Sequence, residues 1–128
     1  MKLLVDTQLL LWAAGMPGKL SAAALELLED PHNTLFYSAA SLWEVVIKNG
    51  LGRSDFAVNP YLLRRGLVDN GWRELAVEGS HTLAVSSLPS IHKDLFDRVL
   101  VAQAQVEGFL LLTTDETLEK YPAPVRVV

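Results

Sequence analysis

Four acidic residues stand in or beside apolar stretches of the chain, where an ionised side chain is costly without a balancing partner. They are Asp6, Glu44, Asp97 and Asp115. Clustered carboxylates cannot all stay ionised without a counter-charge, and oxygen ligands of this kind suit the hard cations Mg²⁺ and Mn²⁺. Such a cation binds a phosphate oxygen and helps to generate hydroxide. The joint pattern therefore indicates metal-dependent chemistry on a phosphate ester.

Three of these acids also have a structural explanation. Asp6 comes directly after a short apolar run, Asp115 comes two threonines after another, and each stands before a predicted helix. Asp is a favoured helix N-cap. Asp97 stands in the first turn of a predicted helix, where an acid interacts favourably with the helix dipole. Its neighbours three, four and seven residues further on are apolar. We expect Asp94 to be the N-cap of that helix and Asp97 to begin its apolar stripe.

Glu44 lies in the segment 39–47, whose only other polar residue is Ser41. A helix that is apolar nearly all round is buried, so Glu44 needs a partner or a metal ion. Two structural alternatives remain open. Ser41 and Glu44 have the spacing of a capping box, although Ser38 is an equally good N-cap, and Glu44 can pair with Lys48 four residues later.

The elements that must position these acids alternate along the chain. Short apolar runs that end abruptly in polar residues predict buried strands, and amphipathic stretches between them predict helices. The pattern favours an α/β fold with a mainly parallel sheet, whose ligands bind beyond the carboxyl ends of the strands. Asp6 and Asp115 fall at such ends. The strands are expected at 2–5, 34–37, 72–77, 109–112 and 125–128, and the helices at 9–14, 22–29, 38–49, 61–69, 80–88 and 96–106, with a helical turn at 117–121.

Composition limits the class of protein. The chain has 128 residues, of which 50% are hydrophobic, and this suits one soluble domain over residues 1–128. The absence of cysteine excludes a disulfide scaffold, a thiolate zinc site and a cysteine nucleophile, and is compatible with a cytoplasmic location. The longest apolar run, 9–14, is too short to span a membrane. A net charge of −4 offers no strong field for nucleic acid, although segment 48–98 is mildly basic.

Motifs of other catalytic classes are missing. The sequence has no phosphate-binding G-x-x-x-x-G-K-[ST] loop and no G-x-S-x-G nucleophile elbow. A D-x-D phosphatase motif fails because Gln8 stands where the second acid would be. The three histidines lack the H-E-x-x-H spacing of a zinc site, and we expect them to pack at the surface or in loops. They are His32, His81 and His92.

Four segments that carry the acids resemble, in this order, the four motifs of PIN domains, most closely those of VapC-like toxin ribonucleases. The resemblance runs from residue 3 to about residue 116. The segments are Leu3-Leu4-Val5-Asp6-Thr7, Ser38-x-x-Ser41-Leu42-Trp43-Glu44-Val45-x-Ile47-Lys48, His92-Lys93-Asp94-Leu95-Phe96-Asp97-Arg98 and Thr113-Thr114-Asp115.

The resemblance implies a PIN-like three-layer α/β/α sandwich and Mg²⁺-dependent endoribonuclease activity, with Mn²⁺ as an alternative ion. It also implies inhibition by a cognate antitoxin protein, commonly with a DNA-binding region, and frequent homodimers. The four acids carry over as the catalytic and metal-binding site, with Asp6 and Asp97 as the first candidates for direct ligands. Thr114 would help to position the site, and Arg98 would either contact a phosphate or orient an acid.

The sequence departs from the family pattern at two positions. Gln8 stands where relatives commonly have His, and Leu95 stands where they commonly have Pro. Neither position supplies a required carboxylate, so the departures bear on substrate details more than on catalysis.

The pattern of acids and the family resemblance leave two alternative functions. In the first, metal-activated water attacks the scissile phosphorus of RNA, and the products carry 5′-phosphate and 3′-hydroxyl ends. In the alternative, a catalytically idle PIN-like module binds RNA or a protein partner. We expect Trp43 and the segment 9–12 to lie in the core, the alternative being that some of them line an antitoxin or dimer groove.

Overall fold

The computed structural model describes residues 1–52 and 57–128, and a five-stranded sheet lies at their centre. The strand order is β3-β2-β1-β4-β5, and each neighbouring pair is parallel. The order switches direction at β1, so the carboxyl ends of β1, β2 and β4 meet at one edge. The strands are β1 (Lys2–Val5), β2 (Thr34–Ser38), β3 (Arg73–Leu75), β4 (Leu110–Thr113) and β5 (Val125–Val127).

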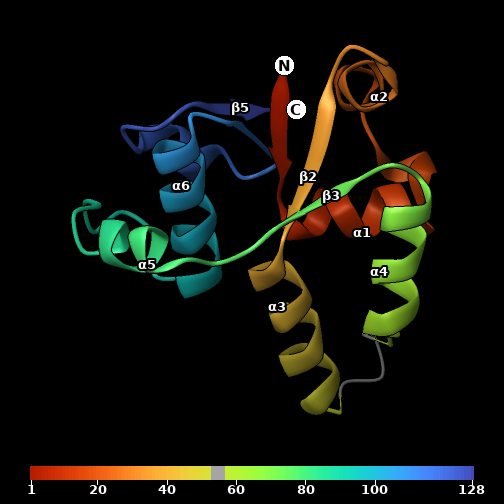
Figure 1. The fold of residues 1–128 in the computed structure, drawn as a ribbon, viewed down its shortest axis with the longest axis horizontal. Helices are drawn as coiled ribbons and strands as arrows, with labels where there is room; N and C mark the ends of the chain where they lie inside the picture. The colour runs from red at the N-terminus through yellow and green to blue at the C-terminus, as the bar shows by residue number, and fades with distance from the viewer. Residues whose placement is uncertain (53–56) are drawn as a thin grey trace.

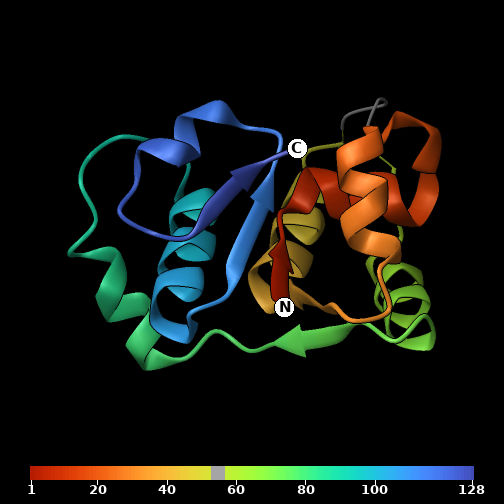
Figure 2. The same ribbon diagram turned by 90° about the horizontal axis from the view of Figure 1, so that it is seen from above.

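Helices cover both faces of this sheet (Figures 1 and 2). Successive strand residues face opposite sides: Leu4 and Leu111 pack in one core with α6, while Leu3 and Leu112 pack in another with α1 and α2. The predicted three-layer α/β/α sandwich is therefore confirmed. The helices are α1 (Thr7–Gly15), α2 (Ala22–Glu29), α3 (Ala39–Gly50), α4 (Pro60–Asp69), α5 (Gly79–Val85) and α6 (Leu95–Glu107), with 3-10 turns η1 (Pro17–Lys19) and η2 (Glu116–Lys120).

The helices begin where the sequence predicts caps. Ser21 Oγ accepts the backbone N–H of Ala24 before α2, and Ser38 Oγ accepts that of Ala40 before α3. The predicted strand at 72–77 shortens to β3, because this edge strand pairs on one side only, with β2. At the end of α6, Gly108 adopts a left-handed φ of 71° that a residue with a side chain rarely takes.

Two predictions about burial are wrong. Trp43 is not in the core: it is 59% exposed on α3, where its ring meets Phe96 edge-on at 5.3 Å between centroids. His81 is not at the surface: it is fully buried, its Nδ1 accepts the Glu78 N–H, and its Nε2 lies 2.9 Å from Glu107 Oε1. These bonds fix α5 against α6 and explain how a polar ring can be buried.

The segment 9–12 divides between core and surface. Leu9 and Leu10 are buried, as predicted, whereas Leu11 and Trp12 are partly exposed. Within the described residues, no helix is both long enough and apolar enough to cross a membrane.

Candidate active site

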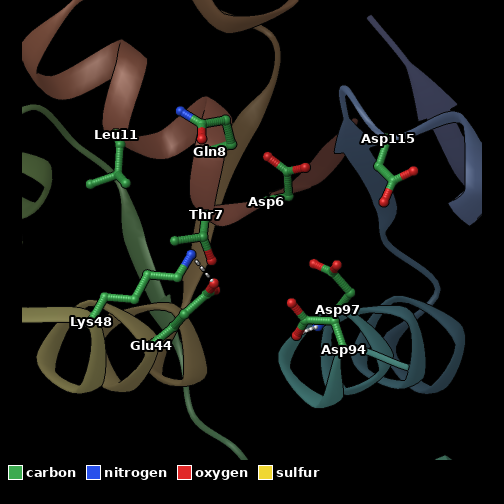
Figure 3. A pocket seen from close by; sticks show the side chains of 9 residues that line it. All are labelled: Asp6, Thr7, Gln8, Leu11, Glu44, Lys48, Asp94, Asp97 and Asp115. Atoms are coloured by element: carbon green, nitrogen blue, oxygen red, sulfur yellow. Dashed lines mark hydrogen bonds and ion pairs between the residues drawn. The ribbon is translucent and has the colours of Figure 1, made fainter. Parts of the chain in front are cut away.

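A cavity of about 360 Å³ lies at the edge where β1, β2 and β4 end. All four acids predicted from the sequence line it, and they come from four different parts of the chain. Their side chains point into one shared space (Figure 3). The lining residues are Asp6, Thr7, Gln8, Leu11, Glu44, Lys48, Asp94, Asp97 and Asp115.

Asp6 is both a helix cap and a member of this pocket. It follows β1 and is 5% exposed; its Oδ1 accepts the backbone N–H of Leu9 at 2.9 Å, which starts α1. Its Oδ2 accepts the hydroxyl of Thr113, at the end of β4, at 2.5 Å. Burial raises the pKa of Asp6, and the nearby charge of Glu44 raises it further. The two explanations given by the sequence are thus compatible.

Glu44 reaches the pocket from α3 and is 6% exposed. Its Oε2 lies 2.8 Å from Lys48 Nζ, one turn further along the helix. The capping-box alternative is wrong, because α3 begins at Ala39 with Ser38 as its cap. The Ser41 hydroxyl instead accepts a bond from the Thr7 hydroxyl at 2.9 Å. The pocket therefore contains the positively charged side chain of Lys48 beside the Glu44 carboxylate.

Asp97 lies in the first turn of α6, and the Asp94 carboxylate caps that helix by accepting the backbone N–H groups of Phe96 and Asp97. The pKa of Asp97 is raised to about 7, first by burial and then by the charge of Asp94. Glu44 and Asp6 raise this pKa as well, whereas His92 lowers it. Acids on β1, α3 and α6 thus share one electrostatic environment.

Asp115 follows β4 and begins η2, where its Oδ1 accepts the backbone N–H of Thr117 at 2.9 Å. Its Oδ2 lies 2.9 Å from Nε2 of His92. Partial burial acts to raise the pKa of Asp115, but the bonds from Thr117 and His92 outweigh it, and the net shift is downward. Unlike Asp6 and Asp97, Asp115 is therefore kept ionised by its own neighbours.

Two residues at the site were not found by sequence reasoning. His92 lies in a loop, as predicted, but there it contacts Asp115 and Asp97, a role that the sequence did not indicate. Thr113 links Asp6 to Asp115, because its oxygen also accepts the Asp115 N–H at 3.0 Å. The position of Thr113 could have indicated this role, because it is the last residue of the buried strand β4 and stands two residues before Asp115.

The remaining predicted residues lie around this centre. The backbone N–H of Thr114 faces Asp6 and lowers its pKa. Gln8 lines the pocket, and Leu95 is an exposed residue at the start of α6. Arg98 lies outside the lining: its guanidinium donates to the carbonyl of Val85 at 3.2 Å and so ties α6 to α5.

Comparison with known proteins agrees with this geometry. The family model described as PIN domain matches residues 3–124. The chain belongs to the PIN domain family. Among solved structures, it resembles a chain of VapBC2 from Rickettsia felis bound to a DNA fragment from their promoter, with 15% identity, a TM-score of 0.73 and coverage of 99% of this chain and 98% of the other. That likeness shows the shared fold. No curated protein matches the chain in sequence.

The pocket of this PIN domain has the chemistry of a divalent-cation site. Its donors are carboxylate oxygens, which hard cations prefer. The pKa values of Asp6 and Asp97 are raised first by burial and further by neighbouring carboxylates, so both acids would be more readily ionised beside a bound cation. Carboxylate oxygens of Asp97 and Asp115 also lie within 4.8 Å of each other. The residues present therefore fit a bound cation.

Proposed function

We propose that this PIN domain is a Mg²⁺-dependent endoribonuclease and the toxin of a toxin–antitoxin pair. The observation that carries the proposal is the convergence of Asp6, Glu44, Asp97 and Asp115 in one cavity at the carboxyl edge of the sheet. So many acids close together destabilise the fold and repel a phosphate group. A bound cation would neutralise these acids and attract the phosphate, which explains why the cluster is present.

Asp6, Asp97 and Asp115 would hold the cation directly or through water, and Glu44 would complete the set or orient the attacking water. Mg²⁺ would supply positive charge to a phosphate oxygen and lower the pKa of water. Glu44, which pairs with Lys48, would accept a hydrogen bond from the nucleophile. Attack by water forms a new P–O bond, breaks the bond to O3′ and transfers a proton to that oxygen. The products carry a 5′-phosphate and a 3′-hydroxyl.

Cleavage of purified tRNA, rRNA and mRNA, with mapping of the new ends, tests this activity. We expect Mg²⁺-dependent cuts with 5′-phosphate ends that disappear with EDTA and return with Mg²⁺ or Mn²⁺. Asp6→Asn should lose at least about a hundredfold in rate while folding normally by circular dichroism, because Asn is also a good N-cap. Glu26→Gln, an exposed acid on α2, is the matched control.

Two results would contradict the proposal. A 2′,3′-cyclic phosphate end would mean that the 2′-hydroxyl, rather than water, is the nucleophile. RNA binding that survives both EDTA and Asp6→Asn, with no cleavage by the wild type, would favour the idle binding module instead.

An antitoxin partner is the second part of the proposal. One similar solved structure is a VapBC2 complex on promoter DNA, and this chain has a groove of about 870 Å³ along α1, α2 and α4. Partly buried apolar side chains line the groove, including Trp12, Leu25 and Trp72. It suits an apolar segment of a second protein. Expression in bacteria should arrest growth, and co-expression of the cognate antitoxin should relieve the arrest.

We also propose that the chain acts in the cytoplasm as a homodimer. Four apolar side chains on and just after α3 are exposed: Trp43, Val46 and Ile47 within the helix, and Leu51 at its C-cap. Such surfaces commonly mark a protein interface. Light scattering should report twice the chain mass for the wild type and the chain mass for Trp43→Asp, and a monomeric wild type would contradict the dimer.

A further inference from the structure

His92 lies in the loop between α5 and α6 and faces two carboxylates of the pocket. Its Nε2 is 2.9 Å from Asp115 Oδ2 and 3.4 Å from Asp97 Oδ2. The side chain is 24% exposed, so it is partly shielded from solvent. An imidazole in this place can act in two ways: it can bind the cation through Nε2, or it can donate a hydrogen bond that holds the acids.

The other ring nitrogen decides between these roles. Nδ1 of His92 lies 3.0 Å from the backbone N–H of Asp94 and accepts a hydrogen bond from it. A backbone N–H can only donate, so Nδ1 carries a lone pair and no proton. The proton of the neutral ring is then on Nε2. Nε2–H is therefore a donor toward Asp115, and it has no lone pair to offer a metal ion.

The backbone around His92 holds the ring in this orientation. The His92 N–H donates to the hydroxyl of Tyr121 at 2.8 Å, and Tyr121 is almost fully buried. On the other side, Asp94 is fixed as the cap of α6. Turning the ring into a metal ligand would require the Nδ1–H tautomer, which breaks the bond from Asp94 and leaves that N–H without its acceptor.

Asp115 keeps the capacity to bind a cation while it accepts this bond. Its Oδ1 accepts from Thr117 and its Oδ2 from His92. Each carboxylate oxygen has two lone pairs, so one on each oxygen remains available. The two bonds fix the direction in which those lone pairs point.

We propose that His92 is a positioning residue that donates from Nε2–H to Asp115, beside Asp97, and orients these acids for a divalent cation that it does not itself bind. This inference rests on the proposed function of the pocket. Partners of this kind typically change metal affinity by about 10- to 100-fold when they are removed. The role links the loop before α6 to the turn after β4, two parts of the chain that must be aligned for the pocket to form.

The first measurement is the tautomer of His92 in the wild-type protein, by long-range ¹H–¹⁵N NMR with and without Mg²⁺. We expect a protonated Nε2 and an unprotonated Nδ1 in both states. The spectrum of His92→Asn assigns the signal, because His32 and His81 keep theirs. An Nδ1–H tautomer in the presence of Mg²⁺, with Nε2 unprotonated, would show a metal ligand and overturn the proposal.

The second measurement is the affinity for Mn²⁺, by electron paramagnetic resonance, in two matched variants. In His92→Gln, the side-chain amide nitrogen can reach the place of Nε2 and donate; in His92→Asn, the shorter side chain can replace Nδ1 but not the donor. We expect His92→Gln to stay within about threefold of the wild type and His92→Asn to lose about 10- to 100-fold. His32→Asn, at an exposed histidine remote from the pocket, should match the wild type.

The outcomes separate this inference from the proposed function. If the wild type binds Mn²⁺ and His92→Asn binds it equally well, the positioning role is overturned and the nuclease proposal stands. If the wild type binds no Mn²⁺, the proposed function fails and the positioning role fails with it. Should His92→Asn not fold, the tautomer of the wild type together with the affinity of His92→Gln still decides.

Discussion

Replacing Asp97 by Asn should stabilise the metal-free protein while it removes metal binding. The pKa of Asp97 is raised from 3.8 to about 7 by burial and by the charges of Asp94, Glu44 and Asp6. Because the folded state holds this proton more tightly than the unfolded state does, ionisation of Asp97 reduces stability; this loss is absent below pH 4, grows as the pH rises to 7 and levels off above pH 7. Asn has no charge to bury, so it avoids that loss.

The size of the effect follows from the pKa. At about 1.4 kcal/mol for each tenfold change in proton affinity, the shift corresponds to about 4 kcal/mol for a site closed to water. The Asp97 side chain is 25% exposed, so solvent screens the repulsion, and we expect about 1–2 kcal/mol at pH 8. Added Mg²⁺ should stabilise the wild type by about 2.7 kcal/mol at a hundred times its Kd, and Asp97→Asn much less.

Urea unfolding between pH 4 and pH 8.5, in EDTA and then in Mg²⁺, measures these differences. The free energies of unfolding of the two proteins should agree near pH 4 and diverge as pH rises to 7, with Asp97→Asn the more stable. Glu26→Gln controls for the loss of an exposed acid. If Asp97→Asn is the less stable protein at pH 8 in EDTA, or if the difference is the same at pH 4 and pH 8, the electrostatic account of the pocket is refuted.

Two further predictions concern the same pocket. Thr113→Val removes the hydroxyl that joins Asp6 to the Asp115 N–H, so we expect the free energy of unfolding in urea to fall by about 1–3 kcal/mol and Mn²⁺ to bind more weakly. Thr113→Ser keeps the hydroxyl and should keep both the stability and the Mn²⁺ affinity. Wild-type stability and affinity in Thr113→Val would contradict the link. Metal binding requires an ionised Asp97, whose pKa is about 7, so the Mn²⁺ affinity should rise up to about tenfold per pH unit below pH 7 and level off above it. A flat affinity between pH 5.5 and pH 7, measured by electron paramagnetic resonance, would show that Asp97 is not a ligand.

Sequence patterns located the four acids because each signal is local. Asp6 follows β1 directly, Asp115 follows β4 after one residue, and Asp97 stands in the first turn of α6. Glu44 stood out because it is the one acid in an apolar helix. An alternating order of strands and helices was then enough to bring their carboxyl ends to one edge.

The residues that sequence reasoning missed depend on partners far along the chain. His92 bonds to Asp115, 23 residues away, and Thr113 bonds to Asp6, 107 residues away. No local pattern distinguishes such a histidine from one that only packs in a loop. The prediction for Trp43 failed for another reason: its apolar type predicts burial, but its side chain on α3 is 59% exposed and contacts the ring of Phe96.

The central claim is that Asp6 and Asp97, with Asp115 and Glu44, hold a divalent cation in this cavity. Anomalous X-ray diffraction from crystals soaked in Mn²⁺, at a concentration that supports RNA cleavage, tests it most directly. We expect an anomalous peak in the cavity at direct-coordination distance from the carboxylates of Asp6 and Asp97. A cavity without such a peak, or a peak only at other sites on the protein, would contradict the account.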